Sequence, residues 1–136
     1  MALTILSILV FSYTMYLIFE TSKAVRSLTA SISAIRTEEN ASEAYFSITI
    51  YNPSEIPLGL YSYRVIAYFD NNYIDEKQSY SYQPLQLPGN TAKNLSVTIS
   101  LNNQTIYPDG SWRLNTRFKF QTPLPGDITF HTVLER

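Results

Sequence analysis

The chain begins with an apolar stretch and then changes to a polar pattern. Residues 1–19 contain no charged side chain, and the first one is Glu20. A helix rises about 1.5 Å per residue, so this stretch spans close to the roughly 30 Å hydrocarbon core of a bilayer. Residues 20–36 contain neither Gly nor Pro. The pattern therefore predicts one long hydrophobic helix over residues 1–36, followed by a hinge at 37–43.

One face of the predicted helix carries a heptad-like pattern, which we call the helix-packing seam. Small or hydroxylated residues dominate its apolar half, which suits close helix contacts in lipid, and aliphatic residues dominate its polar half. Two interpretations follow: a membrane anchor whose later turns rest on their own domain, or a helix that packs against copies of itself. The seam consists of Thr4, Ser7, Phe11, Thr14, Ile18, Thr21, Val25, Leu28, Ile32 and Ile35.

Residues 44–136 alternate between apolar and polar positions, which is typical of half-buried strands. Turn residues such as Asn52-Pro53 and Leu87-Pro88-Gly89-Asn90 separate the alternating segments. Short strands at this spacing predict an antiparallel sandwich. The expected fold class is thus α+β in one chain, a long hydrophobic helix followed by an all-β antiparallel sandwich. The predicted strands cover residues 44–51, 58–69, 73–82, 93–101, 112–121 and 127–134.

Composition and charge exclude several classes of function. The formal charge of −1 disfavours nucleic acid as a partner, and the absence of Cys removes thiol catalysis and Cys-based zinc sites. His131 is the single histidine and has no partners at triad spacing, so we expect no catalytic residue, metal or cofactor. Asp70, Asp75 and Glu76 lack the spacing of a calcium loop and predict a solvated hairpin. The many tyrosines could stack on cell-surface glycans, although cross-strand pairing is their commoner role.

Two features give opposite predictions for the side of the membrane on which the β domain lies. No Lys or Arg precedes the apolar stretch, whereas Lys23, Arg26 and Arg36 follow it, so the positive-inside rule places the β domain in the cytoplasm. Alternatively, a basic leader once preceded Met1 and was removed. The glycosylation sequons at Asn40, Asn94 and Asn103 favour an exported domain at the cell surface.

The segment Ser47–Ala67, SITIYNPSEIPLGLYSYRVIA, followed by Tyr68-Phe69-Asp70, resembles the signature of the LEA14 or water-stress (WHy) domain family. Leu87-Pro88-Gly89, before the alternating segment Leu95–Leu101, is similar to a later turn of that family. The resemblance implies an immunoglobulin-like sandwich that serves as an interaction module, with no catalytic residues to transfer.

The plan of the whole chain is similar to that of mature archaeal type IV pilins, in which a hydrophobic helix leads into a β-sandwich. Bacterial pilins carry a glutamate at the fifth position of the mature chain, and Ile5 stands there, which is compatible with the archaeal type. This resemblance implies a structural subunit of a pilus-like filament that serves adhesion or cell–cell contact. Its partners would be copies of itself, and the membrane before assembly. The competing hypothesis is a membrane-anchored sandwich that acts as an accessory or envelope-binding subunit; an enzyme is the least favoured class.

Overall fold

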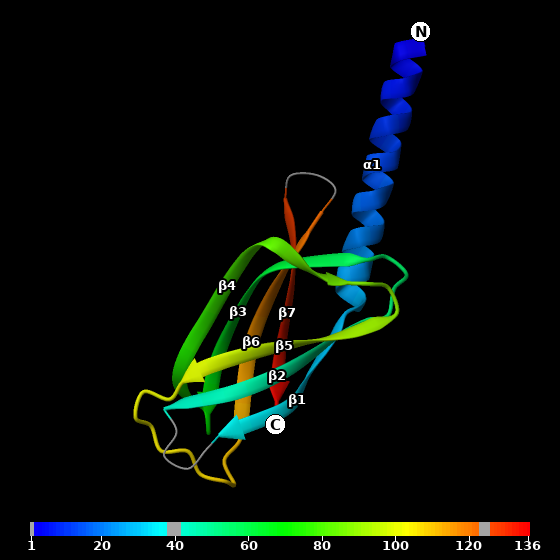
Figure 1. Ribbon diagram of the computed structural model, residues 1–136. Helices are drawn as coiled ribbons and strands as arrows, with labels where there is room; N and C mark the ends of the chain where they lie inside the picture. The colour runs from blue at the N-terminus through cyan, green and yellow to red at the C-terminus, as the bar shows by residue number, and fades with distance from the viewer. Residues whose placement is uncertain (1, 38–41, 123–125) are drawn as a thin grey trace.

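Helix α1 (Ala2–Ser27) projects from one end of a β-sandwich in the computed structural model of the chain (Figure 1). The structure describes residues 2–37, 42–122 and 126–136. Helix α1 contains 26 residues, and seven strands follow it within these described ranges. The predicted fold class, an N-terminal helix followed by an antiparallel sandwich, is confirmed.

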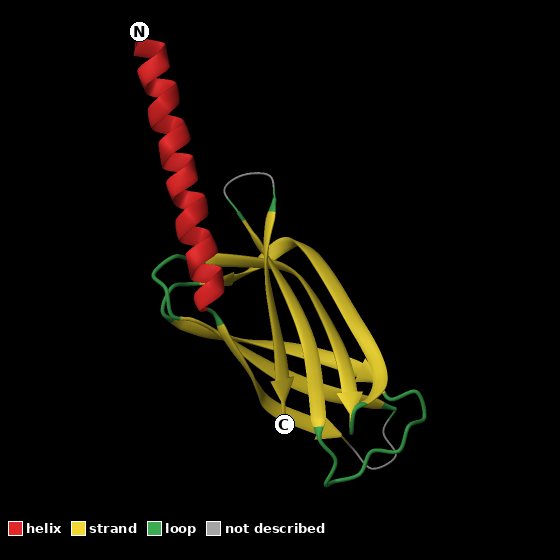
Figure 2. Cartoon of the chain, turned by 180° about the vertical axis from the view of Figure 1, so that it is seen from behind, coloured by secondary structure: helices red, strands yellow, loops and turns green. Residues whose placement is uncertain are grey.

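The strands form two sheets, which lie face to face and whose neighbouring strands are all antiparallel (Figure 2). One sheet has three strands in the order β1-β2-β5 and the other has four in the order β4-β3-β6-β7. The fourth strand therefore pairs with the third, whereas in immunoglobulin constant domains it lies in the same sheet as the first two. The strands are β1 (Thr29–Thr37), β2 (Glu43–Asn52), β3 (Leu58–Phe69), β4 (Asn72–Leu87), β5 (Thr91–Ser100), β6 (Trp112–Gln121) and β7 (Asp127–Glu135).

The core lies between the two sheets and follows the alternation of the sequence. Phe46, Ile48 and Ile50 on β2 are at most 2% exposed. Trp112, the single tryptophan, packs edge-on against Phe46 with ring centroids 4.9 Å apart. Alternate residues of a strand point to the same face, so the predicted apolar faces of the strands become the inner faces of the sandwich.

The prediction that the helix continues through residue 36 is wrong. Helix α1 ends at Ser27, and Leu28 alone separates it from β1. The sandwich therefore begins at Thr29 rather than at residue 44. Of the predicted hinge, Thr37 ends β1 and Glu43 begins β2, while residues 38–41 lie outside the described part of the chain.

A β-bulge explains why β1 looked helical. The register of β1 against β2 shifts between Ile32 and Ala34, which leaves Ser33 as an extra residue. Ile32 and Ile35 consequently both pack against the core, although three positions separate them. A spacing of three is normal on one helix face, and here the bulge produces the same spacing on one face of a strand.

A buried asparagine holds together two connections at the helix end of the sandwich. The side chain of Asn52 is 0% exposed and donates to the backbone carbonyl of Ile56 at 2.8 Å, with longer contacts to those of Leu87 and Pro88. Its carbonyl oxygen accepts from the backbone and the hydroxyl of Ser54, at 3.1 and 2.7 Å. We call this group the Asn52 clamp, and it gives the Asn-Pro segment a structural role.

Candidate functional site

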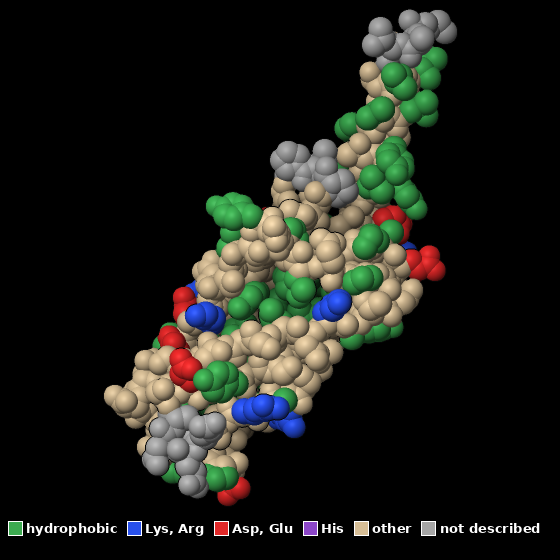
Figure 3. Space-filling model, viewed as in Figure 1, with side chains coloured by type: hydrophobic (Ala, Val, Ile, Leu, Met, Phe, Trp, Pro, Cys, Tyr) green, Lys and Arg blue, Asp and Glu red, His purple; other side chains and the backbone are tan. Residues whose placement is uncertain are grey.

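The projecting part of α1 exposes apolar side chains on every side. The residues from Ile8 through Phe11 are consecutive, so they point in all directions around the axis, and each is 58–66% exposed. Charged side chains appear only near the base of the helix (Figure 3). By length and composition α1 could cross a membrane, and it is equally compatible with a signal sequence.

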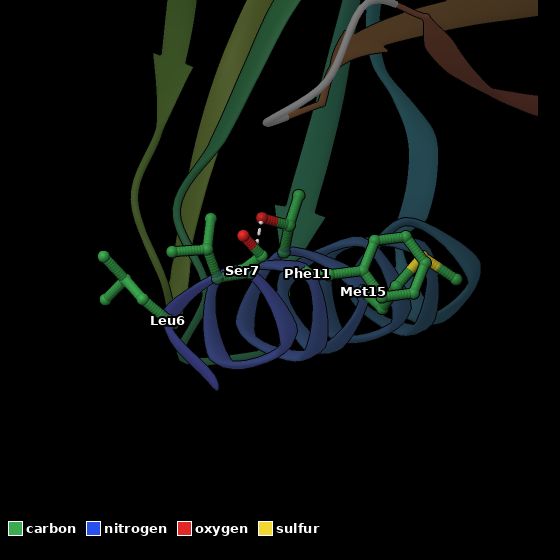
Figure 4. A pocket seen from close by; sticks show the side chains of 6 residues that line it. Leu6, Ser7, Phe11 and Met15 are labelled. Atoms are coloured by element: carbon green, nitrogen blue, oxygen red, sulfur yellow. Dashed lines mark hydrogen bonds between the residues drawn. The ribbon is translucent and has the colours of Figure 1, made fainter. Parts of the chain in front are cut away.

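A shallow groove runs along one face of this exposed helix. It follows the first part of the helix-packing seam, and Ser7, Phe11 and Thr14 belong to both the seam and the groove (Figure 4). The Thr14 hydroxyl donates to the carbonyl of Val10 at 2.8 Å, so this polar group is satisfied within the helix. The groove is lined by Leu6, Ser7, Val10, Phe11, Thr14 and Met15.

The last turns of α1 are embedded in the sandwich. Ala24 and Val25 are 1% exposed and Leu28 is 4% exposed, and the helix contacts β2, β3 and β7. The structure therefore divides the predicted helix-packing seam into three parts. Thr4 to Ile18 lie on the projecting helix, Thr21 to Leu28 face their own domain, and Ile32 and Ile35 lie on β1.

Two of the three predicted glycosylation sites lie on the described surface. Asn94 is an exposed residue of β5, and its side-chain oxygen accepts from the Thr49 hydroxyl at 2.7 Å. Asn103 is exposed in the connection between β5 and β6, with a φ of 62°. Asn40 lies outside the described residues.

Two of the three acidic residues weighed as calcium ligands, Asp70 and Glu76, have partners within the protein. Asp70 accepts from the backbone of Ser111 at 2.8 Å, which joins the β3–β4 turn to the start of β6. Glu76 on β4 forms an ion pair with Arg64 on β3. Within the described ranges, no group of three His, Cys, Asp or Glu side chains could hold a metal ion.

Three tyrosines form a ladder of rings on the outer surface of the four-stranded sheet. Tyr61 and Tyr80 have ring centroids 5.6 Å apart, and Tyr80 and Tyr82 have centroids 5.1 Å apart, both nearly perpendicular. The exposed fraction of the side chain reaches 58% at Tyr80 and 91% at Tyr82. We call these three residues the tyrosine ladder.

The inner end of the ladder is fixed by an ionic network. The Tyr61 hydroxyl donates to Asp127 Oδ2 at 2.6 Å, and Lys119 Nζ lies 2.8 Å from the same oxygen. Desolvation and the neighbouring Asp127 carboxylate raise the pKa of Tyr61 to about 12. Hydrogen bonds from Lys119 and Tyr61 lower the pKa of Asp127. Tyr61 is therefore neutral and Asp127 charged at neutral pH, which keeps the hydrogen bond in place.

A bulge in β4 brings Tyr82 out of the sheet. Leu60 pairs with Leu85 and Ser62 pairs with Tyr80, so four residues of β4 lie opposite Tyr61 alone. The tyrosines were noted in the sequence, but this arrangement was not predicted because nothing in the spacing locates the bulge. The order Tyr-Ser-Tyr-Gln-Pro, with a proline that cannot donate in the ladder of the sheet, is the available signal.

Comparisons with solved structures support the sandwich. The solution structure of a candidate late embryogenesis abundant (LEA) protein has a TM-score of 0.55 at 14% identity, over 92% of this chain and 82% of that chain. The crystal structure of a protein from Archaeoglobus fulgidus has a TM-score of 0.52 at 12% identity, over 81% of this chain and 92% of that chain. At such identities the likeness shows the fold alone, and it fits the LEA14-like part of the predicted resemblance. It gives no support to the resemblance to pilins.

No protein-family model and no curated protein sequence matches the chain.

Proposed function

We propose that this chain is a single-pass membrane protein whose LEA14-like β-sandwich is held at the membrane surface as a binding module. The observation that carries the proposal is the projecting part of α1, which exposes ten large apolar or aromatic side chains between Ile5 and Phe19. So much apolar surface around a helix is stable in lipid and unfavourable in water. The sandwich would act as an accessory or envelope-binding subunit of a larger complex.

The division of the helix-packing seam supports an anchor over a polymer. One of the arguments for a polymer was a seam running through both halves of a long helix. Val25 and Leu28 instead fill the core of their own domain, and Ile32 lies on β1. A helix whose later turns rest on their own sandwich is the geometry expected of the anchor.

We propose binding rather than catalysis for the sandwich. The side chains with shifted pKa values have structural neighbours that explain the shifts. Tyr61 on β3 bonds to Asp127 on β7 across β6, and Arg64 on β3 pairs with Glu76 on β4. Desolvation and the nearby Asp75 and Glu76 raise the pKa of Tyr73. Burial and these neighbouring side chains explain the pKa shifts, so the shifts do not point to a catalytic residue.

Membrane insertion can be tested by placing charge at the middle of the apolar stretch. Arginines at Leu9 and Val10 together raise the free energy of insertion by about 5–7 kcal/mol. The wild-type chain should resist carbonate extraction from membranes, and the double variant should be released. Tyr107→Arg, on the exposed β5–β6 connection, is the control and should stay in the membrane fraction. Release of the wild-type chain by carbonate would contradict the proposal.

On this proposal the sandwich faces the cell exterior, which the exposed sequons at Asn94 and Asn103 support. The positive-inside rule applied to Lys23 and Arg26, both exposed, predicts the cytoplasm instead. A protease added to intact cells distinguishes the two. Digestion of the sandwich supports the exterior, and protection of the sandwich until the cells are lysed would place it inside.

The groove on α1 favours a second candidate function, assembly through the helix into a pilus-like filament. Small side chains on one helix face let a second helix approach closely in lipid, and Ser7 and Thr14 line this groove. Ser7→Leu would fill the groove, whereas Ser12→Leu changes the opposite face. Filaments sheared from cells and seen by electron microscopy, lost in the first variant and kept in the second, would establish this function. Their absence from wild-type cells would leave the anchor.

A further inference from the structure

The tyrosine ladder lies at the end of the sandwich from which the helix projects. Tyr61 contacts Asp127, the first residue of β7, so the ladder lies at the β6–β7 hairpin end of its sheet. That end and the bend of β4 point in the same direction as the N-terminus of α1 (Figure 1). A hydrophobic side chain projects from the sandwich there (Figure 3). If α1 spans a membrane, this end of the sandwich faces it.

The chain around the ladder lacks charge. No charged side chain occurs from Gln78 to Ala92, a stretch that includes the second half of β4 and the turn after it. The charges of β4 lie in its other half, at Asp75, Glu76 and Lys77. Asp127 and Lys119, at the inner end of the ladder, neutralise each other as an ion pair. A surface that is aromatic, hydrogen-bonding and uncharged matches the headgroup region of a bilayer.

The ladder is also held in place before any partner arrives. Ring contacts hold Tyr80 against Tyr61, and the Tyr61 hydroxyl is bound by Asp127. In the bulge, the Ser81 hydroxyl accepts from the backbone of Gln83 and donates to its carbonyl. Tyr82 is nevertheless 91% exposed. A large aromatic ring held almost entirely in solvent has gained nothing from burial within its own chain, so its position suits an external surface.

We propose that the tyrosine ladder docks the sandwich onto the headgroup region of the same membrane that α1 spans. Tyrosine places its ring among lipid headgroups while its hydroxyl stays hydrated, which is why it is enriched at membrane interfaces. The proposal rests on the proposed membrane function and extends it. Docking gives the sandwich a second point of contact with the membrane, away from the helix, and so fixes its orientation.

Spin labels on the full chain in phosphatidylcholine vesicles test the docking. The chain contains no Cys, so each introduced cysteine is the only labelling site. A label at Val10→Cys reports insertion of α1, and a label at Gln83→Cys reports the surroundings of the ladder with all three tyrosines intact. A label at Asn103→Cys, on the far β5–β6 connection, is the aqueous reference. Accessibility to a water-soluble nickel chelate should be at least roughly twofold lower at residue 83 than at residue 103.

Tyr80→Ser together with Tyr82→Ser should abolish this protection at residue 83. Tyr73→Ser is the matched control, because Tyr73 is a half-exposed tyrosine in the far half of β4, and protection should persist. Unchanged Trp112 fluorescence shows that the variants are folded.

The outcomes separate the two proposals. If the label at residue 10 is in the hydrocarbon and the label at 83 is as accessible as that at 103, docking is wrong and the membrane span stands. If the label at 10 is accessible to the chelate, the span itself is wrong, and docking fails with it. Spin–spin broadening between labels at 83 that disappears on dilution in lipid would assign the ladder to a second copy of the chain and overturn docking.

Discussion

Replacement of Asn52 tests whether the Asn52 clamp holds the helix end of the sandwich together. Its amide donates to the carbonyl of Ile56 at 2.8 Å, and its oxygen accepts from Ser54. In Asn52→Ala, the carbonyl of Ile56 and the backbone amide of Ser54 lose the hydrogen bonds that the Asn52 side chain makes with them. Each buried polar group that loses its partner destabilises by about 1–3 kcal/mol. We therefore expect a loss of about 3 kcal/mol, a large part of the roughly 5–15 kcal/mol that stabilises a typical domain.

Urea unfolding of the full chain in detergent micelles measures this loss. Trp112 is 5% exposed and lies between Phe46 and Phe69, so its fluorescence reports the integrity of the core. At a slope of about 1–3 kcal/mol per molar urea, the midpoint should fall by roughly 1–3 M with no change of slope. Asn94→Ala is the matched control: an exposed asparagine with one hydrogen bond, whose loss should change stability by about 0.5 kcal/mol or less.

Asn52→Asp sharpens the test, because it preserves shape and exchanges the amide donors for a carboxyl group. Burial beside backbone carbonyls raises the pKa of such a carboxyl above its value of about 3.9 in the unfolded chain. A group whose pKa is raised in the folded state loses stability as the pH rises between the unfolded and folded pKa values. The variant should therefore be less destabilised at about pH 4 than at pH 7. If Asn52→Ala is no more destabilising than Asn94→Ala, or if the pH dependence runs the other way, the clamp does not act as described.

Further changes test the helix base, a turn and the ladder. Leu28→Ala removes a buried side chain from the core and should destabilise the sandwich by about 3 kcal/mol in the same urea assay; an unchanged midpoint would mean that α1 does not dock. Gly89→Ala should also lower the midpoint, because a Cβ there would lie 2.5 Å from the backbone oxygen of Glu55, and a stability equal to wild type would contradict this close approach. Asp127→Asn should lower the pKa of Tyr61 from about 12 toward 10, which a titration of tyrosinate absorbance measures against Tyr61→Phe as the reference. Because hydrogen bonds hold the Asp127 pKa below 3.8, the contribution of this network to stability should be complete above that pH and lost as the pH falls through the lowered pKa.

The strands of the sandwich could be predicted because local rules and tertiary packing agree there. The segment with Phe46, Ile48 and Ile50 alternates and is bounded by Asn52-Pro53, and it forms β2. Alternation places one face in the core, and proline ends the ladder of the strand. The same agreement holds for β3 and β6, whose predicted limits match the structure.

The end of the helix could not be predicted from spacing, because residues 28–36 fit both periods. Leu28, Ile32 and Ile35 recur at helical spacing, while Leu28, Ala30 and Ile32 also alternate as in a strand. Pairing with β2 decides between them, and that interaction is not local in sequence. The bulge at Ser33 then places Ile35 on the inner face.

The candidate surfaces depended on the same kind of long-range information. The projecting apolar helix follows directly from the absence of charge before Glu20. The tyrosine ladder does not, because Tyr61 and Asp127 are 66 positions apart and meet only when β3 and β7 join one sheet. The sequence could not predict what buries Val25 for a similar reason, since the helix-packing seam could equally contact another chain or its own sandwich.

The connection of α1 to β1 through the single buried residue Leu28 has a mechanical consequence. Tension applied along the helix passes directly into β1, because no slack segment lies between them. β1 is an edge strand bound to β2 along its length from Thr29 to Thr37, so the load acts in shear on many hydrogen bonds at once. Bonds loaded together resist more force than bonds opened one after another. The sandwich is therefore coupled rigidly to α1, and in the proposed membrane anchor pulling and twisting forces on the helix would pass directly into the sandwich.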